Sequence, residues 1–432
     1  MFRFASVAIP GWIAAGFLFA AAIALADLSG TFTGQLEQPP IDYPTRAPTD
    51  AIAALNQRIL AGQVELKFSR PSGYLRSVLE ALHIPVESQM LVFSKTSFQA
   101  RRINPHNPRS LFFNDTVALG WVRGGDILEV ASEDPRQGVI FYVLDNAPAA
   151  KPQFQRNDHC LQCHESYSTV GVPGMLLRSV YPASDGTPMY AAGTYETDHR
   201  SPIEQRWGGW FVTGDLGSTR HLGNALFADP QNPNPVTPKL SRNPHSVEGR
   251  FDTTGYLSPY SDIVALMVFE HQMRMINLLT RVGWEIRYAK YEEQQKAVSN
   301  DFVERRLRET AAEIVDYMLF VDEAPLDGKV QGSSGFAETF AAEGPFDRQG
   351  RSLRQFDLQA RLMRYPCSYM IYSPAFDALP AEARDSVAQR LWQVLSGQDR
   401  DPKYARLTQA DRRAIIEILR ATKKDLFRSQ FQ

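Results

Sequence analysis

A five-residue motif, Cys160-Leu161-Gln162-Cys163-His164, limits the chemistry that this chain can carry. The whole chain has only three cysteines, and two of them fall in this motif with the histidine directly attached. Their spacing places both thiols on one turn of backbone. Three kinds of chemistry use such a pair, namely a redox-active dithiol, part of a zinc site, and the covalent attachment of haem.

The surroundings of the motif argue against the first two uses. A redox-active C-x-x-C pair is expected beside a βαβ pattern, at the start of a helix, but residues 151–159 lack the apolar pattern of a buried strand. A structural zinc site needs further Cys or His ligands at short spacing. His159 could supply one. The third cysteine, Cys367, is distant in the sequence, and we predict that it is a small apolar residue of the core.

Haem attachment accounts for all three side chains. Each thiol can add to a vinyl group of haem and form a thioether, and the following histidine then lies beneath the iron, where imidazole is a common proximal ligand. Over these five residues the chain resembles the c-type cytochromes. The resemblance implies one covalently attached haem c, bound through Cys160 and Cys163, with His164 as the proximal ligand of the iron. The small cytochrome c fold is helical on both sides of its haem, and the β-rich flanks of this motif depart from it.

Two histidines are candidates for the iron position opposite His164. The first is His271, the one strongly polar member of an apolar stripe at helical spacing. The stripe also contains Val264, Met267, Met275, Leu278 and Val282. A buried ring nitrogen needs a partner, which is either the iron or a hydrogen-bonding group of the core. The alternative is His221, on a glycine-flanked loop, which could ligate the iron, act as an acid–base group beside it, or be an ordinary loop residue.

The propionate groups of haem need cationic or hydrogen-bonding partners. Several suitable residues follow the motif in the sequence: Arg178, Arg200, Arg206, Trp207 and Trp210. Each could equally be a surface or packing residue, so the sequence alone selects none of them.

The N-terminus has the pattern of a secretory signal peptide. A positive residue, Arg3, precedes an apolar stretch over 12–25, and Ala24-Leu25-Ala26 fits the small-x-small cleavage rule, which predicts removal of residues 1–26. The alternative is an uncleaved anchor, because residues 5–26 carry no charge and are long enough to cross a bilayer; only then do we expect membrane contact. Bacteria attach c-type haem outside the cytoplasmic membrane, so the resemblance implies a periplasmic or secreted protein.

The periodicity of the chain predicts an α+β fold, with a β-rich N-terminal and haem-bearing part followed by a mostly helical C-terminal part. Short apolar runs separated by turn residues predict an antiparallel sheet between 90 and 144. A period near 3.6 predicts helices over 258–289, 301–319 and 380–396, and a capping box at Thr408 starts a last one. The expected regions are 27–150 (α+β), 151–255 (haem attachment) and 256–432 (helical), which could also form one domain.

The predicted function is that of a periplasmic mono-haem c-type cytochrome, carrying electrons between redox partner proteins or small-molecule donors and acceptors. The length of the chain, 432 residues, leaves room for a second function, a haem-dependent oxidoreductase acting on peroxide, oxygen or a small substrate at an open distal site. A gas-binding haem sensor is a third. No catalytic residue is assigned, and whether the protein is an enzyme stays open. The formal charge of -2 argues against a nucleic-acid partner.

Overall fold

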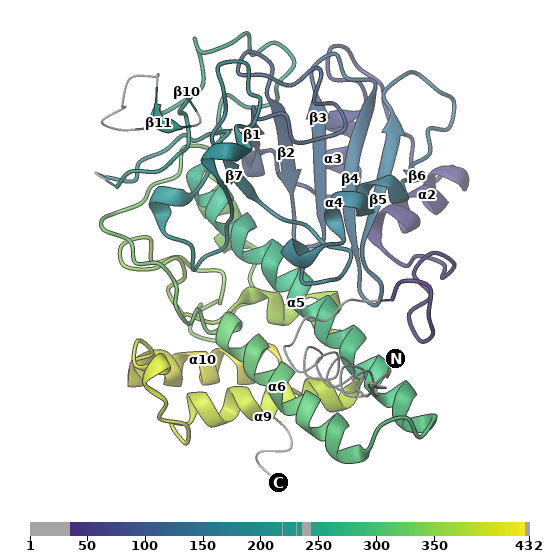
Figure 1. Cartoon of the computed structure of the whole chain (residues 1–432), viewed down its shortest axis with the longest axis vertical. Coiled ribbons are helices and arrows are strands. Elements are labelled where there is room, and N and C mark those ends of the chain that lie inside the picture. Colours follow the sequence, from purple (N-terminus) through teal and green to yellow (C-terminus); the bar gives the residue numbers. More distant parts are fainter. Residues whose placement is uncertain (1–34, 218, 230, 236–242, 428–432) are drawn as a thin grey trace, which may run out of the picture.

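The centre of the molecule is a seven-stranded antiparallel sheet with the strand order β6-β5-β4-β3-β2-β1-β9 (Figure 1). The computed structural model describes residues 35–217, 219–229, 231–235 and 243–427. The strands of the sheet are β1 (Met90–Val92), β2 (Arg109–Phe113), β3 (Val117–Val122), β4 (Ile127–Asp134), β5 (Gly138–Asp145), β6 (Gln155–Arg156) and β9 (Trp210–Phe211). The longest pairing joins β4 and β5, which form a hairpin in continuous register.

Side chains on the two faces of the sheet belong to two separate hydrophobic cores. On one face, Leu119 and Tyr142 pack in a cluster with helices α2 (Ala51–Leu60) and α3 (Leu75–Ala81). On the other face, Ala118 and Phe141 belong to a larger cluster with helix α5 (Ile263–Gln294). Successive residues of a strand point to opposite faces, so both faces of this sheet are buried by helices.

The C-terminal part is helical and packs against α5, as Figure 1 shows for its yellow and green segments. Its helices are α6 (Asn300–Met318), α7 (Phe336–Ala342), α8 (Pro374–Asp377), α9 (Ala381–Leu395) and α10 (Gln409–Thr422). Side chains of α5, α6, α9 and α10 share one hydrophobic cluster with those of β5 and of the segment after the C-x-x-C-H motif. The region that follows this motif and the helical part therefore share a core.

The predicted α+β fold is confirmed, including the antiparallel sheet and the helical C-terminal part. The expected start of the long helix is wrong by five residues, because Asp262 caps it by accepting hydrogen bonds from the Val264 and Ala265 amides. The capping box at Thr408 is present, with Asp411 as its second member. The signal peptide predicted over 1–26 lies outside the described residues. Within the described part of the chain, no helix has the length and apolarity needed to cross a membrane.

Two short hairpins lie outside the main sheet. The strands β7 (Arg178–Val180) and β8 (Thr194–Glu196) pair with each other, as do β10 (Phe227–Asp229) and β11 (Asn232–Pro235). The C-x-x-C-H motif spans the end of a 3-10 turn (Asp158–Cys160) and the single turn α4 (Leu161–His164). In Figure 1, α4 lies in front of β4 and β5, and β7 lies in front of β1 and β2.

A buried carboxyl group at the end of β4 makes the stability of this fold depend on pH. Glu133 is only 2% exposed, and neither of its side-chain oxygens has a hydrogen-bond partner among the described residues. Burial, reinforced by the charges of Asp115 and Asp134, raises the pKa of Glu133 from 4.5 to about 8. Because this pKa is higher in the folded state, the associated stability is fully present below about pH 4.5 and is lost as the pH rises through about 8.

We therefore expect Glu133→Gln, which cannot ionise, to lose less stability than the wild type between pH 5 and pH 8. Between pH 5 and pH 8 the wild type should lose about 3 kcal/mol more than this variant, because only its carboxyl must stay protonated or be buried charged. Urea unfolding of both proteins at pH 5 and pH 8 measures the two losses. Glu65→Gln, at an exposed glutamate, is the control. Identical pH dependence in Glu133→Gln and the wild type would contradict the prediction.

Candidate haem attachment site

The two motif cysteines lie on one short helical turn at the edge of the larger core. Asn157 caps the preceding turn by accepting a hydrogen bond from the His159 amide, and α4 follows without a break. Cys160 is partly buried and packs against the core together with Leu161, whereas Cys163 is exposed. Both thiols are free. One thiol of the motif is thus exposed to solvent and the other is partly covered by the core.

The histidine of the motif is held in a defined orientation. The Nδ1 atom of His164 lies 2.9 Å from the carbonyl oxygen of Gly174, and its ring packs against Phe141 with 4.8 Å between the ring centroids. A neutral imidazole that donates from Nδ1 has its lone pair on Nε2. Among the described residues, the hydrogen bond at Nδ1 is the one that the His164 ring makes. Ligating histidines commonly use one ring nitrogen for the metal and donate from the other to a carbonyl group.

The carbonyl that orients His164 is itself fixed by α5. Asn277 on α5 accepts a hydrogen bond from the Met175 amide and donates one to the Met175 carbonyl, at 3.1 and 2.7 Å. The Gly174 amide donates back to the His164 carbonyl, at 2.9 Å. A Cβ atom at Gly174 would collide with the Asn277 side chain, so the loop needs glycine to approach the helix this closely.

The electrostatic surroundings keep the imidazole neutral. Burial lowers the pKa of His164, and the positive charges of Arg109 and Arg178 lower it further. Burial also raises the pKa of the Cys160 thiol to about 12, with the charge of Glu129 acting in the same direction. A neutral imidazole with a free Nε2 is the form that binds a metal ion.

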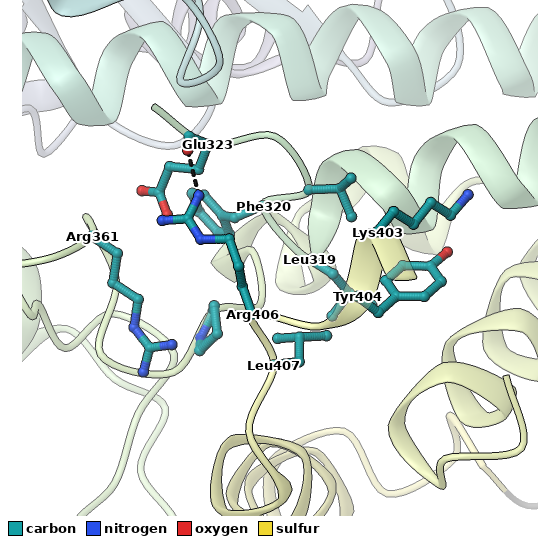
Figure 2. Close-up of a pocket in the computed structure, with 10 residues that line it drawn as sticks. Leu319, Phe320, Glu323, Arg361, Lys403, Tyr404, Arg406 and Leu407 are labelled. Atoms are coloured by element: carbon teal, nitrogen blue, oxygen red, sulfur yellow. Dashed lines mark hydrogen bonds between the residues drawn. The ribbon is translucent and has the colours of Figure 1, made fainter. Parts of the chain in front are cut away.

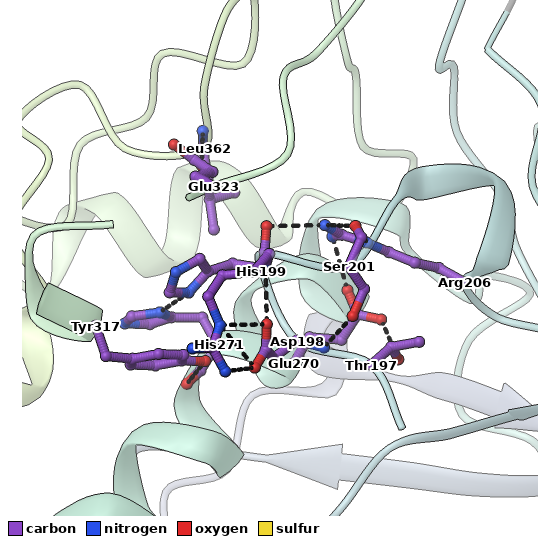
Figure 3. Close-up of polar contacts among 11 residues, drawn as sticks. Thr197, Asp198, His199, Ser201, Arg206, Glu270, His271, Tyr317, Glu323 and Leu362 are labelled. Atoms are coloured by element: carbon purple, nitrogen blue, oxygen red, sulfur yellow. Dashed lines mark hydrogen bonds and ion pairs between the residues drawn. The ribbon is translucent and has the colours of Figure 1, made fainter. Parts of the chain in front are cut away.

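The first candidate for the opposite iron position, His271, belongs to a different group of side chains (Figure 3). Its Nδ1 lies 2.8 Å from Nδ1 of His199, and its Nε2 lies 2.7 Å from the Ser368 hydroxyl. The ring stacks on Tyr317 and Phe320 and has no exposed surface. Burial lowers the pKa of His271 to about 3. Both ring nitrogens are thus engaged, and the structure leaves neither free for an iron.

The second candidate, His221, is also engaged at both nitrogens. Its Nδ1 accepts a hydrogen bond from the Gly223 amide at 2.9 Å, so Nε2 carries the proton and donates to Asn243 at 2.8 Å. The ring lies edge-on to Trp207, and burial lowers the pKa of His221 to about 4. His221 is therefore a loop histidine whose two ring nitrogens both have hydrogen-bond partners.

A buried ion pair beside His271 is a part of the core that the sequence did not reveal. Arg206 donates to the Glu270 carboxylate at 3.0 Å, and Thr197 donates to the same carboxylate at 2.7 Å (Figure 3). Despite both partners, burial raises the pKa of Glu270 to about 7. Arg206 also donates to the His199 carbonyl. Arg206, one of the arginines considered for the haem propionates, therefore binds groups of the core.

A cavity of about 40 Å³ lies in the helical part, away from the motif (Figure 2). It is lined by Leu319, Phe320, Val321, Glu323, Arg361, Pro366, Lys403, Tyr404, Arg406 and Leu407. A cavity of this size holds a few water molecules at most and is too small for a haem. Among the described residues, no group of three or more His, Cys, Asp or Glu side chains is placed to hold a metal ion.

Comparison with known proteins identifies no relative, since no family model, curated protein or solved structure matches this chain. The fold and the site must therefore be interpreted from their own geometry.

Proposed function

We propose that this chain is an exported mono-haem c-type cytochrome that carries electrons between redox partners. The observation that carries the proposal is the state of His164, whose Nδ1 is fixed by the Gly174 carbonyl while its Nε2 is free. Adjacent to it are two free thiols at the spacing that haem attachment requires. The residues present therefore fit a haem, which when bound supplies an iron that changes between two oxidation states.

Three side chains of the motif would hold the haem. Each of the Cys160 and Cys163 thiols would add across a vinyl double bond, with a new S–C bond at one carbon and the thiol hydrogen transferred to the other. The His164 imidazole would donate its Nε2 lone pair to the iron. Because Cys163 is exposed and Tyr167, in the next turn, is 83% exposed, the attachment turn faces solvent. A redox partner protein or a small-molecule donor or acceptor could therefore approach it.

Export is part of the same proposal. The N-terminal segment 1–26 has the pattern of a signal peptide, and c-type haem is attached outside the cytoplasmic membrane of bacteria. We propose a periplasmic or secreted location, with the two motif cysteines reserved for thioether bonds and Cys367 buried and unpaired.

The test is a pyridine haemochrome of the denatured protein, purified from a host that attaches c-type haem. We expect one thioether-linked haem per chain, which remains with the polypeptide during acid–acetone extraction. Haem that is extracted, or no haem at all, would overturn the proposal.

One observation favours a second function, that of a haem-dependent oxidoreductase with an open distal site. Neither His271 nor His221 has a free ring nitrogen, since all four nitrogens are within hydrogen-bond distance of other groups. An iron that lacks a strong sixth ligand can bind a small molecule. Carbon monoxide distinguishes the two functions, because rapid binding to the reduced protein supports the oxidoreductase, whereas no binding supports the electron carrier.

A further inference from the structure

The peptide group between Gly174 and Met175 connects the motif histidine to helix α5. Its carbonyl oxygen, which belongs to Gly174, lies 2.9 Å from Nδ1 of His164. Its N–H, which belongs to Met175, donates to Oδ1 of Asn277 at 3.1 Å. Because a carbonyl oxygen can only accept, the His164 ring donates from Nδ1. Asn277 and His164 are therefore the two ends of one chain of hydrogen bonds that runs through a single peptide group.

The loop that carries this peptide group is attached to the core on both sides of Gly174. On one side, the Val139 amide of β5 donates to the Pro173 carbonyl at 3.1 Å. On the other side, Asn277 donates from Nδ2 to the Met175 carbonyl at 2.7 Å, so it binds both backbone groups of one residue. These two attachments fix the plane of the Gly174 peptide group, and with it the direction of the carbonyl oxygen that meets the imidazole.

Asn277 is a polar side chain in an apolar part of α5. It is 1% exposed, and the residues on either side of it, Ile276 and Leu278, belong to the larger core. Burying an amide costs free energy unless it is hydrogen-bonded, and here both the oxygen and the nitrogen of the amide bind Met175. A Cβ atom at Gly174 would lie 2.2 Å from Oδ1 of Asn277, so the loop and the helix are fitted closely. The contact with the loop accounts for the amide at this position.

Hydrogen bonds in such a chain strengthen one another. A peptide group that donates from its N–H becomes a better acceptor at its carbonyl oxygen. A better acceptor at Nδ1 fixes the tautomer of the imidazole and raises the basicity of its other nitrogen, as the outer partners of metal-binding histidines do. Asn277 can therefore act on Nε2 of His164 without touching the ring.

We propose that Asn277 is a positioning residue for His164, which holds the Gly174 carbonyl on Nδ1 and thereby sets how strongly Nε2 binds the haem iron. A more basic imidazole stabilises ferric iron relative to ferrous iron, so this contact lowers the reduction potential. The effect on the iron rests on the proposed function, whereas the effect on the imidazole can be tested without haem.

The first test uses the full chain without haem, produced in a host that does not attach c-type haem. Nitrogen-15 NMR of labelled histidines at pH 7.5 reports which ring nitrogen of His164 carries the proton, and the signal is assigned by its loss in His164→Ala. We expect the proton on Nδ1 in the wild type and a mixture of both tautomers in Asn277→Leu. A proton mainly on Nε2 in the wild type, or on Nδ1 alone in Asn277→Leu, would overturn the inference.

The second test measures the ferric-to-ferrous ratio of the holoproteins at a fixed ambient potential. Loss of one hydrogen bond from the chain should lower this ratio about two- to tenfold in Asn277→Leu. Asn277→Asp keeps an acceptor for the Met175 amide and should hold the ratio at or above the wild-type value. Gly174→Ala pushes against Asn277 from the loop; it should also lower the ratio, and it carries the test if Asn277→Leu fails to fold.

Gln272 provides the matched control on the same helix. It is also 1% exposed, and it donates to the Asn114 carbonyl at 2.7 Å and accepts from the Tyr369 hydroxyl at 2.6 Å. Gln272→Leu also removes a buried amide from α5, but it should change the ratio less than about twofold, because its partners lie outside the motif loop. Equal changes in Gln272→Leu and Asn277→Leu would show a general loosening of α5 and would overturn the inference.

Haem content by pyridine haemochrome is recorded before the ratios are compared. A chain without thioether haem refutes the proposed function, and the tautomer of His164 still decides whether Asn277 positions the ring. If thioether haem is present and both Asn277→Leu and Gly174→Ala keep the wild-type ratio, the inference alone is overturned.

Discussion

Replacing both Cys160 and Cys163 with serine should abolish covalent haem attachment and leave a folded, colourless chain. Serine has nearly the same shape as cysteine, but its hydroxyl does not form a thioether. Cys163 is exposed and Cys160 is only partly buried, so we expect little change in stability. Haem staining after denaturing electrophoresis measures the attachment, and circular dichroism measures the fold.

The third cysteine provides the matched control for this experiment. Cys367 is fully buried in the larger core, and burial raises the pKa of its thiol to about 12. We expect Cys367→Ala to retain one covalent haem per chain, with a loss of stability of about 1 kcal/mol from the missing sulfur. Covalent haem that persists in the Cys160→Ser/Cys163→Ser protein would show that the motif is not the attachment site.

Replacing Arg206 with methionine should lower the free energy of unfolding by about 3–5 kcal/mol, because Glu270 then loses its buried cation and must either stay charged in the core or take up a proton. The side chains of this pair are 3% and 0% exposed. The substitution also removes the donor to the His199 carbonyl and two hydrogen bonds to the Ser201 carbonyl. Urea unfolding at pH 7.5 measures the loss, at a pH above the raised pKa of Glu270, about 7.

A neighbouring arginine offers a matched control for this prediction. Arg200 has a guanidinium group 2.6 Å from Asp198, but its side chain is 42% exposed. Solvent screens such a pair, so Arg200→Met should cost no more than about 1 kcal/mol. If Arg206→Met and Arg200→Met destabilise the protein equally, the buried ion pair does not contribute as we expect.

Secondary structure was largely predictable because it depends on neighbouring residues. Apolar runs and turn residues between 90 and 144 located five strands of the sheet, the 3.6 period located α5, α6 and α9, and the capping box at Thr408 located α10. The two-residue strands β6 and β9 carry no such pattern. Their pairing depends on the strands beside them, which sequence periodicity does not report.

The surroundings of the motif were much less predictable. The partner of the His164 ring is a backbone carbonyl ten residues later, and no residue type or spacing marks this contact. Arg206 was among five candidates for the haem propionates, and only the structure shows that it is paired with Glu270.

His271 shows the same limit for a single residue. The apolar stripe around it correctly indicates burial, because periodicity reports which face of a helix is apolar. Which group satisfies the ring depends on residues distant in the chain, here His199 and Ser368.

The α+β class and the C-x-x-C-H motif could be read from the amino-acid sequence, and the motif led to the haem attachment that we propose. These depend on residue types at short spacing, which need no knowledge of the fold. The tertiary structure was needed to show that Nδ1 of His164 is bound by the Gly174 carbonyl, and that both nitrogens of His271 and His221 have partners. Those contacts join segments that are distant in the chain, and packing of the sheet against α5 brings them together.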